Sequence, residues 1–318
     1  MKIVVLDGYA VNPGDISWQN ISTLGELIVH HRTPANMTVE NIADAEIVFT
    51  NKTPITKEVF DGCPAIRYVG VLATGYNVVD LEYARSKGIT VTNIPDYSTS
   101  SVCQFVFALL LEICNNVKLH SDSVHAGEWV RCPDFTYWKT PLLELAGKTL
   151  GVFGYGSIGS SVAATAKTFG MNVICNTRTP SRIKPDSGVS SVSFEELLAK
   201  ADVISLHSPL TVQTQNIINS ETINQMKTGV IIINTARGPL VKESDMRQAL
   251  ESGKVAYYAA DVVSKEPMEK NNPLLGAKNC IITPHIAWAA RESRLRLMEI
   301  AFQNLNSYLQ GCPQNVVN

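Results

Sequence analysis

The chain has 318 residues, of which 45% are hydrophobic and 18% charged, and its formal net charge is −2 at pH 7. This length and apolar content allow a core large enough for two domains. The lysines and arginines are scattered singly, which excludes the basic patch that nucleic acids or anionic membranes require, so small molecules are the expected partners.

No segment predicts a signal peptide or a membrane span. The apolar run at the N-terminus is broken by Asp7 and Gly8, and the apolar helical stretch Val102–Cys114 is too short to cross a bilayer. The seven cysteines form no CxxC pair and have an odd count, which is typical of a reducing compartment. The histidine spacings place no two ligands on one helical face. We therefore expect a cytoplasmic protein without a metal site or a membrane partner.

The first hundred residues predict a small α/β domain. Short apolar runs at 3–6, 46–50 and 67–72 predict strands, and the segment 80–87 predicts a helix. Tyr97–Ser101 supplies N-cap residues for a long apolar helix that starts near Val102 and that we interpret as the first crossing between domains. Residues 120–146 are irregular and rich in aromatic side chains, which favours a packing or subunit-contact segment over a catalytic site.

From residue 148 onward, apolar runs rich in β-branched residues alternate with helical patterns. These runs lack the polar alternation of a half-exposed strand and predict a parallel sheet covered by helices on both faces. They lie at 149–153, 171–175, 202–206, 229–234, 257–260 and 280–283. The last helix, from about 290 to 309, has an apolar face that must pack against another surface.

A glycine-rich turn between the first of these strands and a helix predicts a dinucleotide site. The first glycine permits a tight turn, the second lets the pyrophosphate approach the backbone, and the third lets the helix and strand pack closely. A second strand follows in the order that such a unit requires, although a turn without a ligand is the alternative. The residues of the turn are Gly154, Tyr155, Gly156, Ser157, Ile158 and Gly159.

The residues after the second strand predict which cofactor is preferred. NAD enzymes offer an Asp or Glu to the adenosine ribose at this place, whereas this chain has Thr177, Arg178 and Thr179. Without the carboxylate, Arg178 can pair with a 2′-phosphate, and the two threonines can donate from their hydroxyls. NADP(H) is therefore favoured over NAD(H). The alternative is that Arg178 is a solvated surface residue and that either cofactor binds.

Three side chains near the ends of successive predicted strands predict the chemistry. Arg237 can hold the carboxylate and the reacting oxygen of a 2-keto acid with its planar fork of donors. His285 can deliver a proton to that oxygen as hydride arrives, and Glu266 can bond the other ring nitrogen and favour the protonated ring. Each residue alone fits an ordinary structural role, but in this order after a dinucleotide turn they predict a reductase.

Several segments of the sequence resemble the D-isomer-specific 2-hydroxyacid dehydrogenase family. They are the glycine turn and residues 206–211, 234–238, 261–267 and 283–288, and the likeness extends over nearly the whole chain. Residues 72–77 and 285–288 are most similar to the glycerate dehydrogenase (hydroxypyruvate/glyoxylate reductase) branch. The resemblance implies two doubly wound parallel-sheet α/β domains: a flavodoxin-like substrate domain, residues 1–99 and 288–318, and a Rossmann dinucleotide-binding domain inserted in it, residues 100–287. The active site would lie in a cleft between the domains.

The resemblance also implies roles for further residues. Backbone amides of a loop would bind the substrate carboxylate, and that loop is Leu72, Ala73, Thr74 and Gly75. Asp261 would accept a hydrogen bond from the nicotinamide carboxamide, and the rest of the cofactor channel would be His207, Pro209, Thr214, Thr235 and Ala236. Lys52 could reach the far end of a substrate and Trp288 could narrow the pocket. A solvated lysine and a packing tryptophan are the alternatives.

The leading hypothesis is an oxidoreductase that reduces a small 2-keto acid, such as hydroxypyruvate or glyoxylate, to the D-2-hydroxy acid. The resemblance implies a homodimer, with residues 120–146 as the suspected contact. The alternatives are a dehydrogenase for a bulkier 2-hydroxy acid or for phosphoglycerate, and a non-catalytic dinucleotide-binding sensor. The arginine, carboxylate and histidine together disfavour the sensor.

Overall fold

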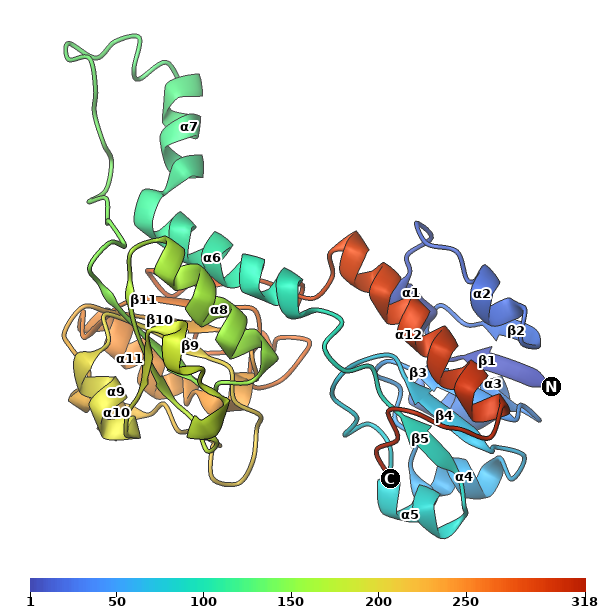
Figure 1. The fold of residues 1–318 in the computed structure, drawn as a ribbon. Coiled ribbons are helices and arrows are strands. Elements are labelled where there is room, and N and C mark those ends of the chain that lie inside the picture. The colour runs from blue at the N-terminus through green and yellow to red at the C-terminus, as the bar shows by residue number, and fades with distance from the viewer. The chain divides into compact units, whose positions relative to one another are not determined.

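The computed structural model describes all residues 1–318 and divides into two compact units. Residues 1–98 and 288–318 form one, here called the terminal unit, and residues 99–287 form the other, the central unit. Each unit is an α/β fold built on its own parallel sheet (Figure 1).

The sheet of the terminal unit has five parallel strands in the order β2-β1-β3-β4-β5. This is the order of flavodoxin-like doubly wound folds. Strands β1, β3 and β4 are almost wholly buried because helices cover both of their faces. The strands are β1 Lys2–Val5, β2 Glu26–Val29, β3 Ile47–Thr50, β4 Tyr68–Val71 and β5 Thr90–Thr92.

The helices of the terminal unit form two layers. The long last helix packs its apolar side, with Leu297, Ala301 and Leu305, on one face of the sheet together with α1 and α2, while α3, α4 and α5 cover the other face. The helices are α1 Gly8–Val11, α2 Gln19–Ser22, α3 Thr38–Ile42, α4 Lys57–Gly62, α5 Leu81–Ser86 and α12 Arg291–Leu309, with a short 3-10 turn η1 Ala35–Met37. After α12, Val316 pairs with Thr92 and continues the sheet edge.

The sheet of the central unit has seven parallel strands in the order β12-β11-β10-β9-β6-β7-β8. The order reverses between β6 and β9, which creates the switch point where ligands of open α/β sheets bind. All five residues of β10 are buried, as expected for a strand covered on both faces. The strands are β6 Thr149–Phe153, β7 Asn172–Asn176, β8 Val189–Ser191, β9 Val203–Leu206, β10 Val230–Asn234, β11 Val255–Ala260 and β12 Cys280–Ile282.

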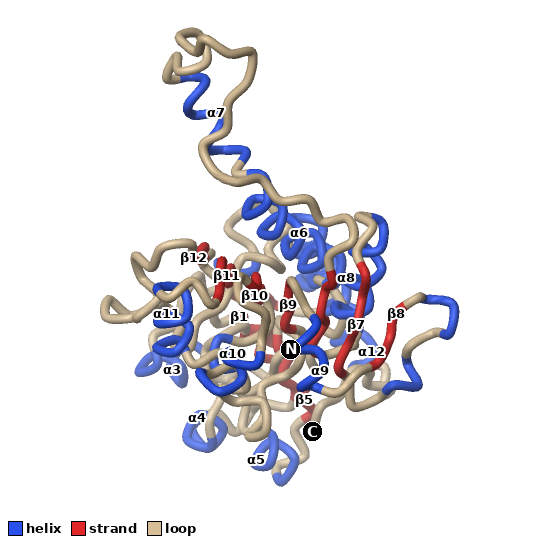
Figure 2. Tube along the Cα trace, turned by 90° about the vertical axis from the view of Figure 1, so that its left-hand side faces the viewer, coloured by secondary structure: helices blue, strands red, loops and turns tan.

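Helices α6 and α8 cover one face of this sheet, and α9, α10 and α11 cover the other (Figures 1 and 2). The two faces bury separate apolar clusters, so the sheet is doubly wound. The helices are α6 Thr99–Asn115, α7 Val117–His125, α8 Ser157–Thr168, α9 Phe194–Lys200, α10 Ser220–Gln225 and α11 Glu243–Glu251, with 3-10 turns η2 Pro180–Arg182, η3 Pro185–Ser187 and η4 Gly238–Leu240.

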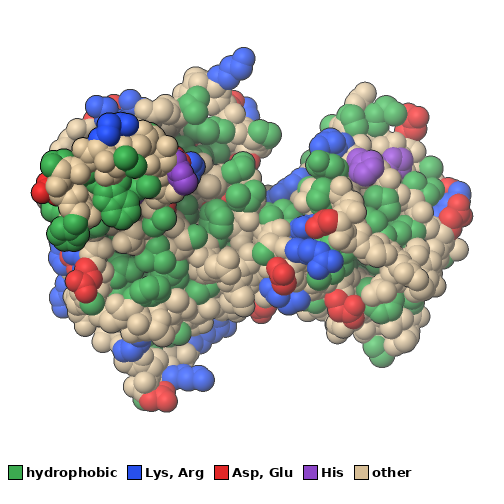
Figure 3. Space-filling model, turned by 90° about the horizontal axis from the view of Figure 1, so that it is seen from above, with side chains coloured by type: hydrophobic (Ala, Val, Ile, Leu, Met, Phe, Trp, Pro, Cys, Tyr) green, Lys and Arg blue, Asp and Glu red, His purple; other side chains and the backbone are tan.

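An arm formed by α7 and the segment after it, residues 117–140, projects from the rest of the central unit (Figure 2). The arm is closed by its own hydrogen bonds, for example Ser123 Oγ with Tyr137 Oη at 2.6 Å and the Lys139 amide to His120 Nε2 at 3.1 Å. Figure 3 looks down on the arm and shows hydrophobic side chains on its nearest surface. The large hydrophobic residues of the arm that are exposed are Val117, Leu119, Val124, Trp129, Val130, Phe135 and Trp138.

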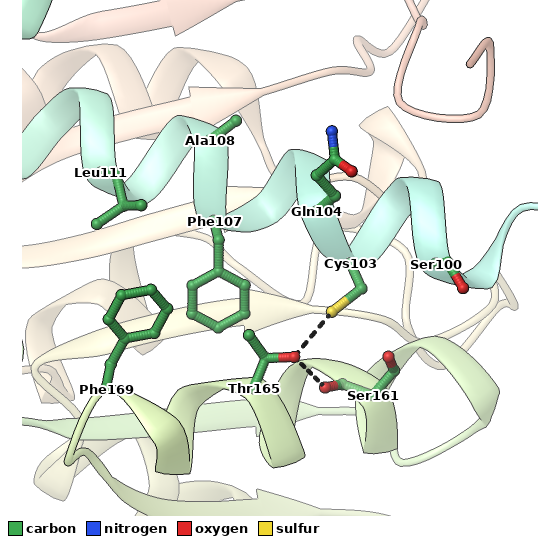
Figure 4. Close-up of a pocket in the computed structure, with 9 residues that line it drawn as sticks. All are labelled: Ser100, Cys103, Gln104, Phe107, Ala108, Leu111, Ser161, Thr165 and Phe169. Carbon is green, nitrogen blue, oxygen red and sulfur yellow. Dashed lines mark hydrogen bonds between the residues drawn. The ribbon is translucent and has the colours of Figure 1, made fainter. Parts of the chain in front are cut away.

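An apolar groove of about 540 Å³ runs between α6 and α8 of the central unit (Figure 4). Phe107 and Phe169 stack at one end of it with ring centroids 5.3 Å apart, and Ser100 and Ser161 lie at the other end. Between them, Cys103 Sγ and Thr165 Oγ1 are 3.4 Å apart. No single helix is long and apolar enough to span a membrane. Helices α6 and α7 meet that criterion only as a pair bent by 54°.

The two doubly wound parallel sheets confirm the predicted fold class, and every strand predicted from an apolar run is present within about two residues. The long helix predicted to start near Val102 begins at Thr99. Three short strands, β2, β5 and β8, were not predicted, and the stretch 120–146 is less irregular than expected because α7 extends into it.

Candidate active site

The glycine turn joins β6 to α8, and its three glycines have different surroundings. Gly154 has a φ of +97°, and a Cβ there would lie 2.7 Å from the backbone of His207. A Cβ on Gly159 would lie 2.0 Å from the Gly154 carbonyl oxygen, whereas a Cβ on Gly156 would meet nothing within 4 Å. The first and third glycines are therefore required by the fold, and the space in front of the second is open.

The first turn of α8 has no side-chain cap, because its N-cap residue is Gly156. The amides of Ser157 and Ile158 are left for a ligand, and a helix N-terminus favours a phosphate. Tyr155 lies against the apolar cluster under α6 and α8.

The segment after β7 carries the residues predicted to choose between the cofactors. Thr177 Oγ1 accepts a hydrogen bond from the Thr179 amide at 3.2 Å, which closes a tight turn around Arg178. Arg178 is exposed, and the side chain of Asn176, the strand residue before the turn, donates to the Val192 carbonyl oxygen at 3.1 Å. The turn presents a guanidinium and two hydroxyls, and it contains no carboxylate.

Arg237 follows β10 in a turn that the strand's own last residue holds. The side chain of Asn234 donates to the Arg237 carbonyl oxygen at 2.9 Å and accepts from the Ala236 amide at 3.0 Å. The Arg237 side chain is exposed, and Nη1 donates to the Ala236 carbonyl oxygen at 2.7 Å. Gly238 is buried against the backbone of Val263. The turn is rigid while the guanidinium remains accessible to a substrate.

Glu266 and His285 form a direct pair. Glu266 Oε2 lies 2.6 Å from His285 Nδ1, and Glu266 Oε1 accepts from the Val263 amide at 3.2 Å. The two side chains keep 35% and 29% of their surface exposed, so a substrate can reach the ring. The carboxylate accepts the proton on Nδ1 and so orients the ring, and Nε2 is the nitrogen that can carry a proton towards a substrate.

Asp261 orients the turn that carries His285. Its side chain is 1% exposed and accepts from Thr283 Oγ1 at 2.6 Å and from the amides of Ile286 and Ala287 at 2.8 and 2.7 Å. His285 has a φ of 55°, a backbone conformation that is uncommon outside glycine, and these bonds hold it there. The contact of Asp261 with a nicotinamide carboxamide stays a prediction.

The other residues predicted to line the cofactor channel follow β9 and β10. Burial lowers the pKa of His207 to about 4, and its Nε2 lies 2.8 Å from Ser205 Oγ, so the ring is neutral at physiological pH. Thr214 Oγ1 donates to the Pro209 carbonyl oxygen at 2.8 Å and closes that loop. Thr235 and Ser208 each have a buried hydroxyl oxygen without a hydrogen-bond partner.

These observations test whether a nicotinamide dinucleotide fits the central unit. Buried polar atoms are normally paired, so the two hydroxyls without partners at the carboxyl ends of β9 and β10 indicate a ligand that is polar. The open space before Gly156 and the uncapped start of α8 suit a pyrophosphate. The residues present therefore fit the cofactor.

The predicted substrate loop lies in the terminal unit, after β4. The carbonyl oxygens of Leu72–Thr74 are all taken, by Asn51 Nδ2 at 2.6 Å, the Ile94 amide at 3.0 Å and Asn93 Nδ2 at 2.8 Å. No protein acceptor takes the amides of Ala73–Gly75. The loop is held through its carbonyl oxygens, and its backbone N–H groups are available as donors. Such a loop is suited to bind an anion.

Lys52 and Trp288 also belong to the terminal unit. The Lys52 amide donates to Asp7 Oδ2 at 2.6 Å, so its backbone is fixed while its side chain is exposed. Trp288 is half-buried and packs edge-on against Tyr97, with ring centroids 6.4 Å apart. Their substrate contacts stay predictions.

Sequence reasoning missed one buried carboxylate beside the site, Glu243 at the start of α11. An acidic residue in the first turn of a helix is common and carries no signal of its own, because it also suits the helix dipole. The roles of Asp261 and of the Gly238 contact were hidden for a similar reason, since both depend on segments distant in sequence.

The chain is similar to known proteins over its whole length. Residues 107–287 match the family model described as D-isomer specific 2-hydroxyacid dehydrogenase, NAD binding domain. The chain is 54% identical to a hydroxypyruvate reductase of Blautia hydrogenotrophica over the full length of both, and 38% identical to a glycerate dehydrogenase of Methylorubrum extorquens over 88% of this chain and 87% of that protein. Among solved structures, an acyclic imino acid reductase in complex with NADPH and D-Arg superposes with a TM-score of 0.87 at 29% identity, covering all of both chains.

Proposed function

The chain belongs to the D-isomer specific 2-hydroxyacid dehydrogenase family, and from this premise we propose that it reduces hydroxypyruvate or glyoxylate to the D-2-hydroxy acid, with His285 as the acid. The family match and the relatives confirm the family predicted from the motifs. They also confirm an oxidoreductase that interconverts a small 2-keto acid and a D-2-hydroxy acid using a nicotinamide cofactor. The observation that carries the proposal is the 2.6 Å pair of Glu266 and His285.

The proposed step moves two electrons and two hydrogens. The reduced nicotinamide, when bound, supplies hydride to the carbonyl carbon. His285 Nε2 gives its proton to the carbonyl oxygen, so the keto group becomes an alcohol and the ring becomes neutral. Glu266 stabilises the protonated ring before the transfer, and Arg237 holds the substrate carboxylate and the carbonyl oxygen with its exposed guanidinium.

We propose that the amides of Ala73–Gly75 bind the substrate carboxylate, that Lys52 interacts with its far end and that Trp288 limits its size. A substrate panel tests these roles and the reaction class together. Hydroxypyruvate and glyoxylate should have the highest kcat/KM, and a branched-chain 2-keto acid or 3-phosphohydroxypyruvate should have a lower one. Cofactor binding without turnover of any keto acid would instead identify a dinucleotide sensor.

For the cofactor, we propose a preference for NADP(H). It is supported by the turn that fixes Arg178 between two threonines and by the absence of a carboxylate after β7. Arg178→Ala should raise the KM for NADPH by about tenfold or more and leave the KM for NADH nearly unchanged. The reason is that only NADPH has the 2′-phosphate with which the guanidinium would pair. Arg182→Ala in the adjacent 3-10 turn is the control. An unsubstituted enzyme that prefers NADH would contradict the proposal.

We further propose a homodimer that uses the arm. Val130 and Phe135 are 88% exposed and Trp138 is 67% exposed, and large apolar side chains gathered on a projecting segment are typical of an interface. The apolar groove between α6 and α8 offers a second such surface on the same unit. Light scattering should give a dimer, and Phe135→Ser with Trp138→Ser should give monomers. Val212→Ser, at an equally exposed position outside the arm, should leave the dimer intact.

We also propose a reducing, cytoplasmic compartment. All seven cysteines are free, and burial raises the pKa of Cys175 and Cys280 to about 11, which makes these thiols unreactive. Thiol labelling of the protein taken directly from cells should find every cysteine reduced. A disulfide in that sample would contradict the assignment.

A further inference from the structure

Glu243 is a buried carboxylate with three hydrogen-bond donors around it. Its residue is 9% exposed; Oε1 accepts from the Ser264 amide at 2.7 Å, and Oε2 accepts from Ser264 Oγ at 2.6 Å and from Asn272 Nδ2 at 2.9 Å. No lysine or arginine forms a salt bridge with it. A charge that is buried without a counterion needs such a full set of donors.

The segment that Glu243 holds is the one that carries Glu266. Ser264 lies near the start of this segment, and Asn272 lies at its end. Between them, Glu266 reaches back to the Val263 amide and across to His285. One carboxylate therefore closes the segment 263–272 into a loop and fixes the position of the backbone that carries Glu266.

The turn of Arg237 packs on the same segment. A Cβ on Gly238 would lie 1.9 Å from the Val263 carbonyl carbon and 2.5 Å from the Ser264 amide nitrogen, so the two backbones are in direct contact. The chain then runs from Gly238 through η4 to Glu243 at the start of α11. The Arg237 turn and the Glu266 segment are thus joined twice, by this contact and by the Glu243 carboxylate.

We propose that Glu243 is a positioning residue: its carboxylate clamps the segment 263–272 so that Glu266 meets His285 Nδ1 while the Arg237 turn stays packed on the same backbone. The clamp rests on the proposed acid role of His285. It acts through Glu266 and has no contact of its own with the substrate.

The polarity of these hydrogen bonds provides the test. In Glu243→Gln, the side-chain oxygen keeps the hydrogen bond from the Ser264 backbone amide. The new NH2 group then faces the NH2 group of Asn272. Asn272 cannot turn over without cost, because its Oδ1 accepts from the Leu274 amide at 2.9 Å. A second change, Asn272→Asp, replaces that NH2 by an acceptor, which restores the contact and keeps the bond to Leu274.

The measurement is kcat for keto-acid reduction per cofactor-binding site, with sites counted by fluorescence titration with NADPH or NADH. Glu243→Gln should lower kcat per site by about tenfold, a loss typical of an unpaired buried donor, and leave the KM for the cofactor unchanged. Glu243→Gln with Asn272→Asp should recover most of the loss. A purely structural role would lower the number of sites and not kcat per site.

Asp245→Asn is the matched control. Asp245 lies on the same helix, is 8% exposed and accepts from the Ser220 amide at 2.9 Å, with no bond to the segment 263–272. It should lower the melting temperature without changing kcat per site. Should Glu243→Gln fail to fold, Ser264→Ala and Asn272→Ala each remove one clamp contact and should each lower kcat per site by about threefold.

The inference is overturned if Glu243→Gln keeps its kcat per site, or if the double substitution leaves kcat as low as the single one. His285→Ala and Glu266→Gln are assayed beside them. If these two also keep their kcat, the proposed function fails as well; if they lose it while Glu243→Gln does not, only the clamp is wrong.

Discussion

Glu266→Gln is the most direct perturbation of the acid pair, because it changes charge and hydrogen-bond polarity without changing size. In the structure, one carboxylate oxygen accepts from the Val263 amide and the other faces His285 Nδ1. The amide oxygen of the variant keeps the Val263 bond, so its NH2 group faces Nδ1. The proton on Nδ1 then has no acceptor, and the ring loses the bond that orients it.

The size of the effect follows from the geometry of the pair. A hydrogen bond to a charged group contributes about 1.5 to 3 kcal/mol. The two side chains are 29% and 35% exposed, so solvent screening places the pair near the lower value. About 1.4 kcal/mol is a factor of ten, and we therefore expect kcat for reduction to fall about tenfold at neutral pH. His285→Ala, which removes the proton donor itself, should lower kcat by about 10² to 10⁴.

The assay is the rate of reduction at neutral pH, followed through the absorbance of the reduced cofactor. Glu266→Gln removes the acceptor that faces His285 Nδ1, so kcat should fall while cofactor affinity stays the same. Glu269→Gln, the same chemical change in the same segment at an exposed ion pair with Lys265, should change neither. An unchanged kcat in Glu266→Gln would refute the role of the pair.

Three further outcomes follow from single contacts. Gly159→Ala should destabilise the fold by about 1 to 3 kcal/mol in urea unfolding, because its Cβ would overlap the Gly154 carbonyl oxygen, whereas Gly156→Ala should leave stability unchanged and weaken cofactor binding; equal stability losses would contradict this contrast. The pKa of His207 is lowered from 6.5 to about 4, so its contribution to the free energy of unfolding is complete above about pH 6.5. That contribution, at most about 3 kcal/mol, is lost as the pH falls towards 4. In His207→Gln, the free energy of unfolding should therefore fall less steeply between pH 6.5 and 4. The same dependence on pH in both proteins would contradict this prediction. Asn304→Leu should cost about 2 to 4 kcal/mol in thermal unfolding because it strands the Asn93 carbonyl and the Asn315 side chain, and a smaller cost would mean that water replaces the bonds.

The strands that sequence reasoning located are the ones buried on both faces. The first four residues of Val230–Asn234, for example, are all apolar and β-branched, which predicts a buried strand. The missed strands are short and all lie at sheet edges. Strand β2 has four residues, none of which is fully buried, and β5 and β8 have three residues each. Helix α7 was missed because it is polar over much of its length and buries a single residue, Ser123.

The residues proposed to carry the chemistry could be found from motifs, because their types and order are distinctive. What holds them could not be found in that way. Asp261 fixes the backbone of His285 through amides more than twenty residues away, and Glu243 fixes the Glu266 segment through Ser264 and Asn272. These bonds depend on which loops the sheet brings together, and a single sequence carries no record of that.

The proposed proton donor, its carboxylate partner, the arginine and the glycine turn all belong to one unit, residues 99–287. Their alignment is set by β6, β10, β11 and β12 and owes nothing to the fold that supplies the loop Leu72–Gly75. Exchange of that loop is therefore a route to an enzyme with a different preference among 2-keto acids. The residues proposed to reduce the carbonyl group would stay unchanged.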